Sequence, residues 1–127
     1  MQINDDQFNV SSLTNFGKEA INLFKNRDFP TLALRFGYAL AYGRVLSDAI
    51  KEDLKYCIAQ ADGRSPLSEV IGPEIEVKFF SPNTTGLEAV VECLVEIIDG
   101  LWIEVDLIVI RNGLIRNLSI EDINYLA

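Results

Sequence analysis

Residues 87–120 read LEAVVECLVEII, DG, LWIEVDLIVIR, NG and LIRNLSI, and this stretch decides the fold. Three runs rich in β-branched residues are separated by two dipeptides, Asp99-Gly100 and Asn112-Gly113. Both dipeptides are preferred centres of two-residue type I′ hairpin turns. The pattern therefore predicts an antiparallel meander of three strands over about residues 87–98, 101–111 and 114–120.

Two tight turns would also fix the pairing of the strands. With two residues in each turn, Ile98 lies opposite Leu101 and Arg111 lies opposite Leu114, and every side chain then belongs to a defined face. One predicted face carries the even positions of the first strand, from Glu88 to Ile98, and so includes Glu92 and Glu96. The same face carries these apolar residues of the next two strands: Ile103, Val105, Leu107, Val109, Leu118 and Ile120. The other carries Ala89, Val91, Cys93 and Val95 with Trp102, Glu104, Asp106, Asn117, Ser119 and Glu121. Since both faces hold apolar residues, we expect helices to cover one face and a partner or a second copy to cover the other.

The residues before the meander predict helices followed by one more strand. Apolar residues at helical spacing predict a helix over residues 13–24, ending near residues 26–30, where Asp28 or Phe29 lies at a cap position and Pro30 begins the next helix. A second helical pattern runs from Leu32 to Ala61, with a bend or break expected near residues 43–47. Asp62-Gly63 predicts its end, and Ser65-Pro66 predicts a short helical turn to about residue 71. Residues 74–79 alternate polar and apolar, as a strand does.

Length and composition indicate one acidic α+β domain. The 127 residues are enough for a single domain, with a helical half at about residues 11–72 and a sheet half at about 74–121. The formal net charge is -8, and residues 64–127 hold 11 acidic residues against 4 basic ones. Such a charge repels phosphate backbones and anionic lipids, so we expect neither nucleic acid nor membrane as a partner. Histidine is absent, which excludes catalysis by an imidazole base and ordinary zinc sites.

The compartment is predicted to be the cytoplasm. The first residues form no secretory signal, and the most apolar stretch, residues 101–110, is interrupted by Glu104 and Asp106. Cys57 and Cys93 form no C-x-x-C motif, and we expect both to be buried apolar residues rather than a disulfide.

The order of these elements resembles the NTF2-like superfamily within the cystatin-like α+β folds. The resemblance covers about residues 13–120, depends mainly on the long strands at 87–98 and 101–111, and includes no diagnostic motif. It implies N-terminal helices packed on a curved, mainly antiparallel sheet, with a conical pocket and frequent dimerisation through the sheet. The superfamily includes isomerases, dehydratases and transport factors, so the fold leaves the function open. Small acidic secretion chaperones are a second architecture that the pattern resembles.

Glu104 and Asp106 are the candidate catalytic residues. They lie two apart on one strand, bordered by Trp102, with Ser119 predicted opposite Asp106 and Glu121 predicted opposite Glu104. In an apolar pocket, desolvation and the like charge would raise the pKa of one carboxyl and let it act as a base. The alternative is that both are ordinary solvated charges at the wet end of the sheet. No motif for a metal or a cofactor is present, so we expect neither.

The helical half contributes further candidates. Tyr38 and Tyr42 lie one helical turn apart and could offer hydroxyls to a pocket, or they could be core-edge residues. Arg35 and Arg44 are expected to anchor carboxylates of the sheet. Together with Trp102, Asn117, Ser119 and Glu121, the tyrosines form the predicted ligand-binding set.

The function predicted from these features is a non-enzymatic module that binds a ligand or another protein and dimerises through its sheet. The expected partner is a small apolar ligand or a basic protein. A basic protein could bind Glu88, Glu92 and Glu96, which lie on one side of a strand as an acidic ridge, but a solvated edge that discourages aggregation explains these residues equally well. The alternative is a small-molecule isomerase or lyase with Asp106 or Glu104 as the general base.

Overall fold

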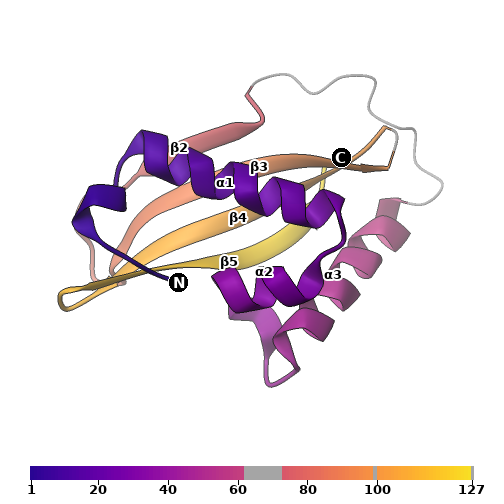
Figure 1. The fold of residues 1–127 in the computed structure, drawn as a ribbon, viewed down its shortest axis with the longest axis horizontal. Coiled ribbons are helices and arrows are strands. Elements are labelled where there is room, and N and C mark those ends of the chain that lie inside the picture. The colour runs from indigo at the N-terminus through magenta and orange to yellow at the C-terminus, as the bar shows by residue number, and fades with distance from the viewer. Residues whose placement is uncertain (62–72, 99, 127) are drawn as a thin grey trace.

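The computed structural model describes residues 1–61, 73–98 and 100–126, and it shows an α+β fold in which three helices precede most of an open, five-stranded antiparallel sheet (Figure 1). The strand order is β1-β5-β4-β3-β2. This confirms the predicted α+β class and the predicted antiparallel meander. The short strand β1, Gln2–Ile3, was not expected, and it pairs with β5 at the sheet border.

Helices α1 and α2 begin at side-chain caps. In α1, Val10–Lys25, the side chain of Asn9 accepts a hydrogen bond from the Ser12 N–H, and in α2, Phe29–Phe36, the side chain of Asp28 accepts one from Thr31. Each cap satisfies an N–H that has no partner within the helix. Pro30 lies in the first turn of α2, as predicted, because that turn needs no N–H from it.

The long helix predicted from residue 32 to residue 61 is two helices. The chain leaves the helical conformation at Gly37, whose φ is 71°, and then passes through a 3-10 turn at Ala39–Ala41. After Gly43, whose φ is 82°, it becomes helical again as α3, Leu46–Ala61. The break therefore begins six residues before the predicted bend. The predicted helix end at Asp62-Gly63 and the turn after Ser65-Pro66 lie outside the described residues.

The other four strands confirm the predicted strand positions, and β4 and β5 run beyond their predicted ends. They are β2, Ile75–Phe79; β3, Leu87–Ile98; β4, Leu101–Asn112; and β5, Ile115–Tyr125. Ile98 pairs with Leu101, as expected. In the second hairpin Asn112 pairs with Ile115, so the turn residues are Gly113 and Leu114 rather than Asn112 and Gly113.

Three irregularities and the displaced second turn correct the predicted register. One irregularity lies between Leu87 and Ala89, and another, between Glu96 and Ile98, shifts β3 so that Glu96 lies opposite Trp102 and Leu94 lies opposite Glu104. The third, in β5, makes Glu121 the extra residue, because Leu107 pairs with Ile120 while Asp106 pairs with Asp122. The displaced turn and this bulge together make the predicted pairs of Asp106 with Ser119 and of Glu104 with Glu121 wrong. Ser119 pairs with Ile108, and Asn124 pairs with Glu104.

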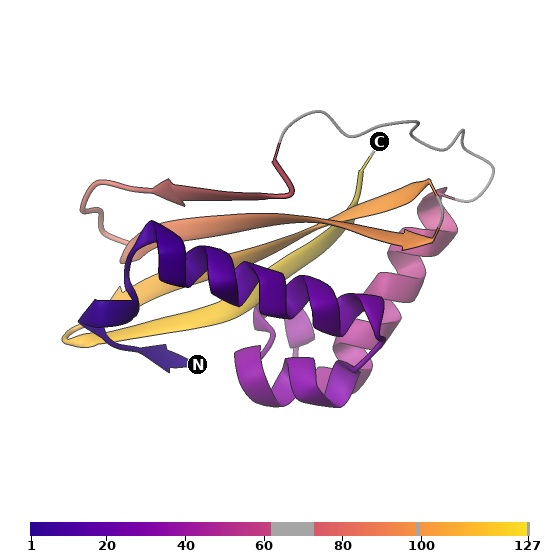
Figure 2. The ribbon, with the colours of Figure 1, turned by 45° about the horizontal axis from the view of Figure 1, so that its top comes forward.

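Because of the irregularity between Glu96 and Ile98, the side chains of β3 lie on the opposite faces from those predicted relative to β4. Its odd positions, together with the odd positions of β4, face the helices and are fully buried: Ala89, Val91, Cys93, Val95, Ile103, Val105, Leu107 and Val109. Helix α1 lies along β3 and β2, and α3 lies near β5 (Figure 2). At Gly17 of α1, an added Cβ would come within 3.2 Å of Cys93 and Ile75, so glycine permits the close packing of this helix on the sheet.

The opposite face of the sheet, called the open face below, carries the remaining side chains of these strands. They are Glu76, Lys78, Val90, Glu92, Leu94, Glu96, Trp102, Glu104, Asp106, Ile108, Ser119, Asp122 and Asn124. The core contacts of the three helices fall on the other face. Within residues 1–61, 73–98 and 100–126, no helix contributes its core contacts to the open face.

Candidate functional site: a carboxylate row on the open face

Four carboxylates cross the open face in a single row. Glu76 of β2 pairs with Glu92 of β3, Glu92 pairs with Asp106 of β4, and Asp106 pairs with Asp122 of β5. Directly opposed residues of an antiparallel pair have Cβ atoms about 4.5–5.5 Å apart, where like charges destabilise the sheet. Glu104 adds a fifth acid, because it lies two residues from Asp106 on the same strand and face. These four residues (Glu76, Glu92, Asp106 and Asp122) are called the carboxylate row below.

Few cations offset this charge. Lys78 of β2 forms an ion pair of 2.6 Å with Glu92, and it is the one cation in the described part of the chain that pairs with the row. Arg116 lies on the other side of the sheet, where its Nε donates to Glu88 at 2.9 Å and its guanidinium stacks on Phe8. The row therefore keeps an excess of negative charge.

The middle of the row is partly buried. Oδ1 of Asp106 and Oδ1 of Asp122 are both inaccessible to solvent and have no hydrogen-bond partner. Desolvation, followed by the charges of Glu104, Asp122 and Glu92, raises the pKa of Asp106 to about 7. Asp106 thus changes its charge near neutral pH, unlike an ordinary aspartate.

Apolar side chains border the acids. Leu94 lies opposite Glu104, Trp102 lies opposite Glu96, and Ile108, next to Asp106 on the same face, is only 5% exposed. These side chains lie on the same face as Asp106, whose burial desolvates its carboxyl. They also offer apolar surface to the aliphatic part of a bound side chain.

The chemistry of the row is that of a cation acceptor. Carboxylate oxygens accept hydrogen bonds from ammonium and guanidinium groups, and the bonds are stronger where water is excluded. Among the described residues, no three His, Cys, Asp or Glu side chains are arranged to hold a metal ion.

The structure brings together only part of the predicted site. Glu104, Asp106 and Trp102 share one face, as the sequence predicts, and Ser119 lies on that face beside Ile108. Glu121, however, occupies the bulge, and Asn117 lies opposite Ile110 toward the hairpin end.

The sequence pattern does not predict three members of the row. It places Glu92 on the opposite face, does not connect Glu76 to the site, and ends the last strand before Asp122. The alternation of Ile123 and Tyr125 with polar residues was a signal that this strand continues.

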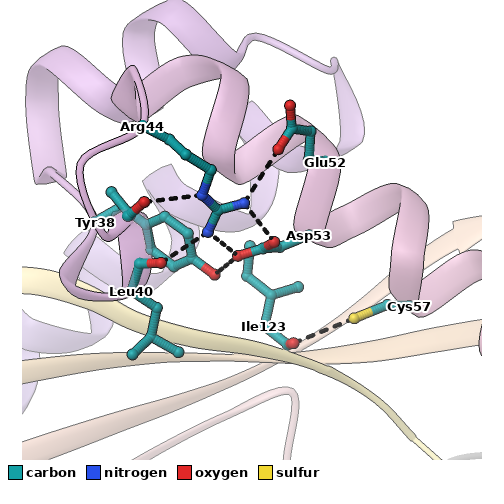
Figure 3. Close-up of polar contacts among 8 residues, drawn as sticks. Tyr38, Leu40, Arg44, Glu52, Asp53, Cys57 and Ile123 are labelled. Carbon is teal, nitrogen blue, oxygen red and sulfur yellow. Dashed lines mark hydrogen bonds and ion pairs between the residues drawn. The ribbon is translucent and has the colours of Figure 1, made fainter.

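The two predicted tyrosines belong to the helical layer. Tyr38 is 6% exposed, and its hydroxyl donates a hydrogen bond of 2.5 Å to Asp53 of α3, whereas Tyr42 is 82% exposed. Figure 3 shows the Tyr38 ring directed toward Asp53 rather than toward the open face. Burial and the bond to Asp53 raise the pKa of Tyr38. The two hydroxyls therefore do not meet in a pocket with Asp106.

Arg44 completes this helical network (Figure 3). Its guanidinium donates to the Leu40 and Ala41 carbonyls, each at 2.8 Å, and to Asp53 at 2.9 Å. Although partial burial opposes the effect, the hydrogen bonds from Arg44 and Tyr38 hold the pKa of Asp53 below its usual value. Arg35 pairs with Glu19 of α1 at 2.7 Å. Both arginines anchor carboxylates of helices, so the prediction that they anchor the sheet is wrong.

Both cysteines are free and buried, as predicted. Cys57 of α3 donates to the Ile123 carbonyl at 3.2 Å, and burial raises the pKa of both thiols. A raised pKa keeps a thiol protonated, so neither cysteine is poised as a nucleophile.

Comparison of the chain with known protein families, with curated proteins and with solved structures found no match. The NTF2-like resemblance therefore stays a prediction. None of the helices in the described part of the chain combines the length and apolarity that a bilayer crossing requires.

Proposed function

We propose that this chain is a non-enzymatic interaction module that binds a basic segment of a partner protein on the open face of its sheet. The observation that carries the proposal is the carboxylate row, which crosses four strands and forms an ion pair with one lysine of the described chain. Opposed carboxylates cost stability, and a bound cationic segment would offset that cost.

The chemistry of the face supports a basic partner over an anionic or neutral one. The sheet half carries most of the net charge of -8, which steers cations toward it and repels anions. Arginine and lysine side chains can place their charged ends on the row while their stems cover Leu94 and Trp102. A second copy of the chain would instead bring a second acidic face, so the predicted dimer fits another surface of the sheet better.

The finer assignments belong to the same proposal. An NTF2-like fold is supported by three helices beside long antiparallel strands, and a cytoplasmic location is supported by the two free cysteines. Neither assignment is needed for the argument from the row.

Trp102 provides the test, because it is the single tryptophan of the chain and lies on the open face. An arginine-rich peptide is titrated while the fluorescence of Trp102 is followed at low ionic strength. We expect saturable binding that weakens roughly tenfold in Asp106→Asn combined with Glu104→Gln. Asp48→Asn together with Glu52→Gln removes the same charge from α3 and should leave the affinity nearly unchanged.

Two results would contradict the proposal. One is an affinity that falls equally in both double variants, since binding would then follow net charge rather than the row. The other is a tryptophan signal that does not respond to the peptide at any ratio. Binding should also weaken as the pH falls from about 8 to 6, because Asp106, with a pKa of about 7, loses its charge there.

The isomerase or lyase is the second candidate. The pKa of Asp106 near 7 favours it, because a general base works best when its pKa is close to the operating pH. The predicted help from a helix tyrosine is absent, since Tyr38 is bonded to Asp53 and Tyr42 is exposed in the helical layer. Loss of turnover without loss of peptide binding in Asp106→Asn would support this candidate.

A further inference from the structure

Strand β2 forms one border of the sheet, as both ribbon views show (Figures 1 and 2). On its inner side it pairs with β3 from Ile75–Cys93 to Phe79–Ala89. On its outer side no strand of the described residues pairs with it. An unpaired edge is a template for another strand.

The hydrogen-bond pattern shows which backbone groups of β2 are available. The Leu94 N–H donates to the Glu74 carbonyl at 2.8 Å, and the Phe80 N–H donates to the Glu88 carbonyl at 3.0 Å. The even residues of β2 therefore direct their backbone groups to β3. Because the direction alternates along a strand, the N–H and C=O groups of Ile75, Val77 and Phe79 point to the free edge.

The side chains of β2 are self-complementary about its middle residue. Read from either end, the strand places an apolar residue, a charge, Val77, the opposite charge and an apolar residue. A two-fold axis at Val77 would pair Glu76 with Lys78 of the second copy on the open face. It would also pair Ile75 with Phe79 of the second copy on the helix side.

We propose that β2 pairs with β2 of a second copy of this chain, antiparallel and centred on Val77, to form one continuous sheet. In this register Val77 exchanges both backbone hydrogen bonds with its symmetry mate, and Ile75 does so with Phe79 of the copy. Two symmetric Glu–Lys pairs flank the axis. The inference does not depend on the basic partner proposed above.

Exposure of the edge agrees with this pairing. Phe79 is 47% exposed although it stacks edge-on against Phe8, with ring centroids 5.4 Å apart. Glu76 is exposed and forms no ion pair with any described residue, whereas the dimer supplies Lys78 of the copy. One five-residue strand buries little area, so we expect a weak dimer that dissociates in the micromolar range or above.

Charge reversal tests the register. Glu76→Lys and Lys78→Glu each place like charges opposite one another, so each variant alone should dimerise roughly tenfold more weakly than the wild type in analytical ultracentrifugation. An equimolar mixture of the two restores opposite charges at both positions and should recover the dimer. Asp48→Lys and Lys55→Glu, matched reversals on α3, should leave the wild-type dimer unchanged. Recovery in the mixture excludes misfolding as the cause of the loss.

Cysteine crosslinking gives a second readout. In the proposed register residue 76 faces residue 78 of the copy in a non-hydrogen-bonded pair, with Cα atoms about 4.5 Å apart, which a disulfide can bridge. Glu76→Cys mixed with Lys78→Cys should therefore form the mixed disulfide in preference to either symmetric one. Cys57 and Cys93 are buried and do not compete. A wild-type chain that stays monomeric into the millimolar range, or a dimer that survives both reversals without the mixed crosslink, overturns the proposal.

Discussion

At the scale of single residues, Asp106 is the side chain whose environment departs most from what its chemistry prefers. A charged carboxylate favours water or a cation, yet its Oδ1 is shielded from solvent and unpaired, with acids on both flanking strands. Core packing alone does not require an aspartate here. A binding role gives a reason for the cost, because a partner's cation would neutralise it.

Replacing this residue should stabilise the free protein. The folded-state pKa of Asp106 is raised from 3.8 to about 7, so the folded state binds more protons than the unfolded state between these values. Stability should therefore fall as the pH rises through that window and level off above it. Asp106→Asn should remove this fall and raise the free energy of unfolding at pH 8 by about 1–2 kcal/mol, a figure reduced from the pKa shift because the group is only half buried.

Urea unfolding of the two proteins at several pH values from about 4 to 8 measures this effect. Asp48→Asn is the control, since Asp48 is exposed on α3 and should leave the pH dependence as it is. A wild-type protein whose stability rises steadily between pH 5 and pH 7 would show that Asp106 does not have the assigned pKa.

At the scale of elements, the sequence correctly predicts the helices and strands whose residue pattern fits only one structure. The cap at Asp28, the proline in the first turn of α2 and the alternation of β2 are local signals, and the structure confirms them. The predicted assignment of the β3 side chains to the two faces was wrong because this strand has apolar residues at both even and odd positions. Its pattern therefore fits either assignment. The three bulges and the displaced second turn settle the register, and none of the bulges has a local sequence signal comparable to a turn glycine.

Between α2 and α3, tertiary contacts override the local pattern of helical spacing. The apolar spacing of residues 32–61 continues through the break, so periodicity alone favours one helix. The structure instead turns the chain at Gly37, and Tyr38 then bridges to Ile120 of β5 while its hydroxyl binds Asp53. These contacts join residues far apart in the sequence, which no window of neighbours reveals.

Removing the Tyr38 hydroxyl should weaken the junction of these helices. Tyr38→Phe leaves Asp53 with one donor fewer in a buried setting, and we expect a loss of about 1–2 kcal/mol in the free energy of unfolding by urea denaturation. Tyr42→Phe is the matched control, because that ring is 82% exposed and its loss should be undetectable. Equal effects of the two changes would mean that the Tyr38–Asp53 bond contributes nothing to stability.

At the scale of the whole molecule, charge is distributed unevenly between the two layers. The helical layer pairs its charges internally, as Arg44 does with Asp53 and Arg35 does with Glu19. The open face of the sheet instead concentrates acids around one lysine. Repulsion on one face and net charge over the whole surface act in the same direction, against the compact state.

Salt should therefore stabilise the free protein rather than destabilise it. Raising NaCl from about 0.02 M to about 0.5 M shortens the Debye length to a few ångströms, which screens repulsion along the carboxylate row, and should raise the free energy of unfolding by on the order of 1 kcal/mol. The same addition should weaken binding of the arginine-rich peptide, because screening removes the attraction that draws it to the row. Thermal or urea unfolding and the Trp102 titration measure the two effects at matched salt concentrations.

If the carboxylate row causes both responses, removing its charges should reduce both of them. Asp106→Asn with Glu104→Gln should reduce the salt response of stability and of binding together, whereas the α3 double variant Asp48→Asn with Glu52→Gln should leave most of each intact. If stability instead fell with salt, attractive pairs such as Lys78–Glu92 would dominate the surface electrostatics. The row would then be compensated within the chain and would have no excess charge to offer a partner.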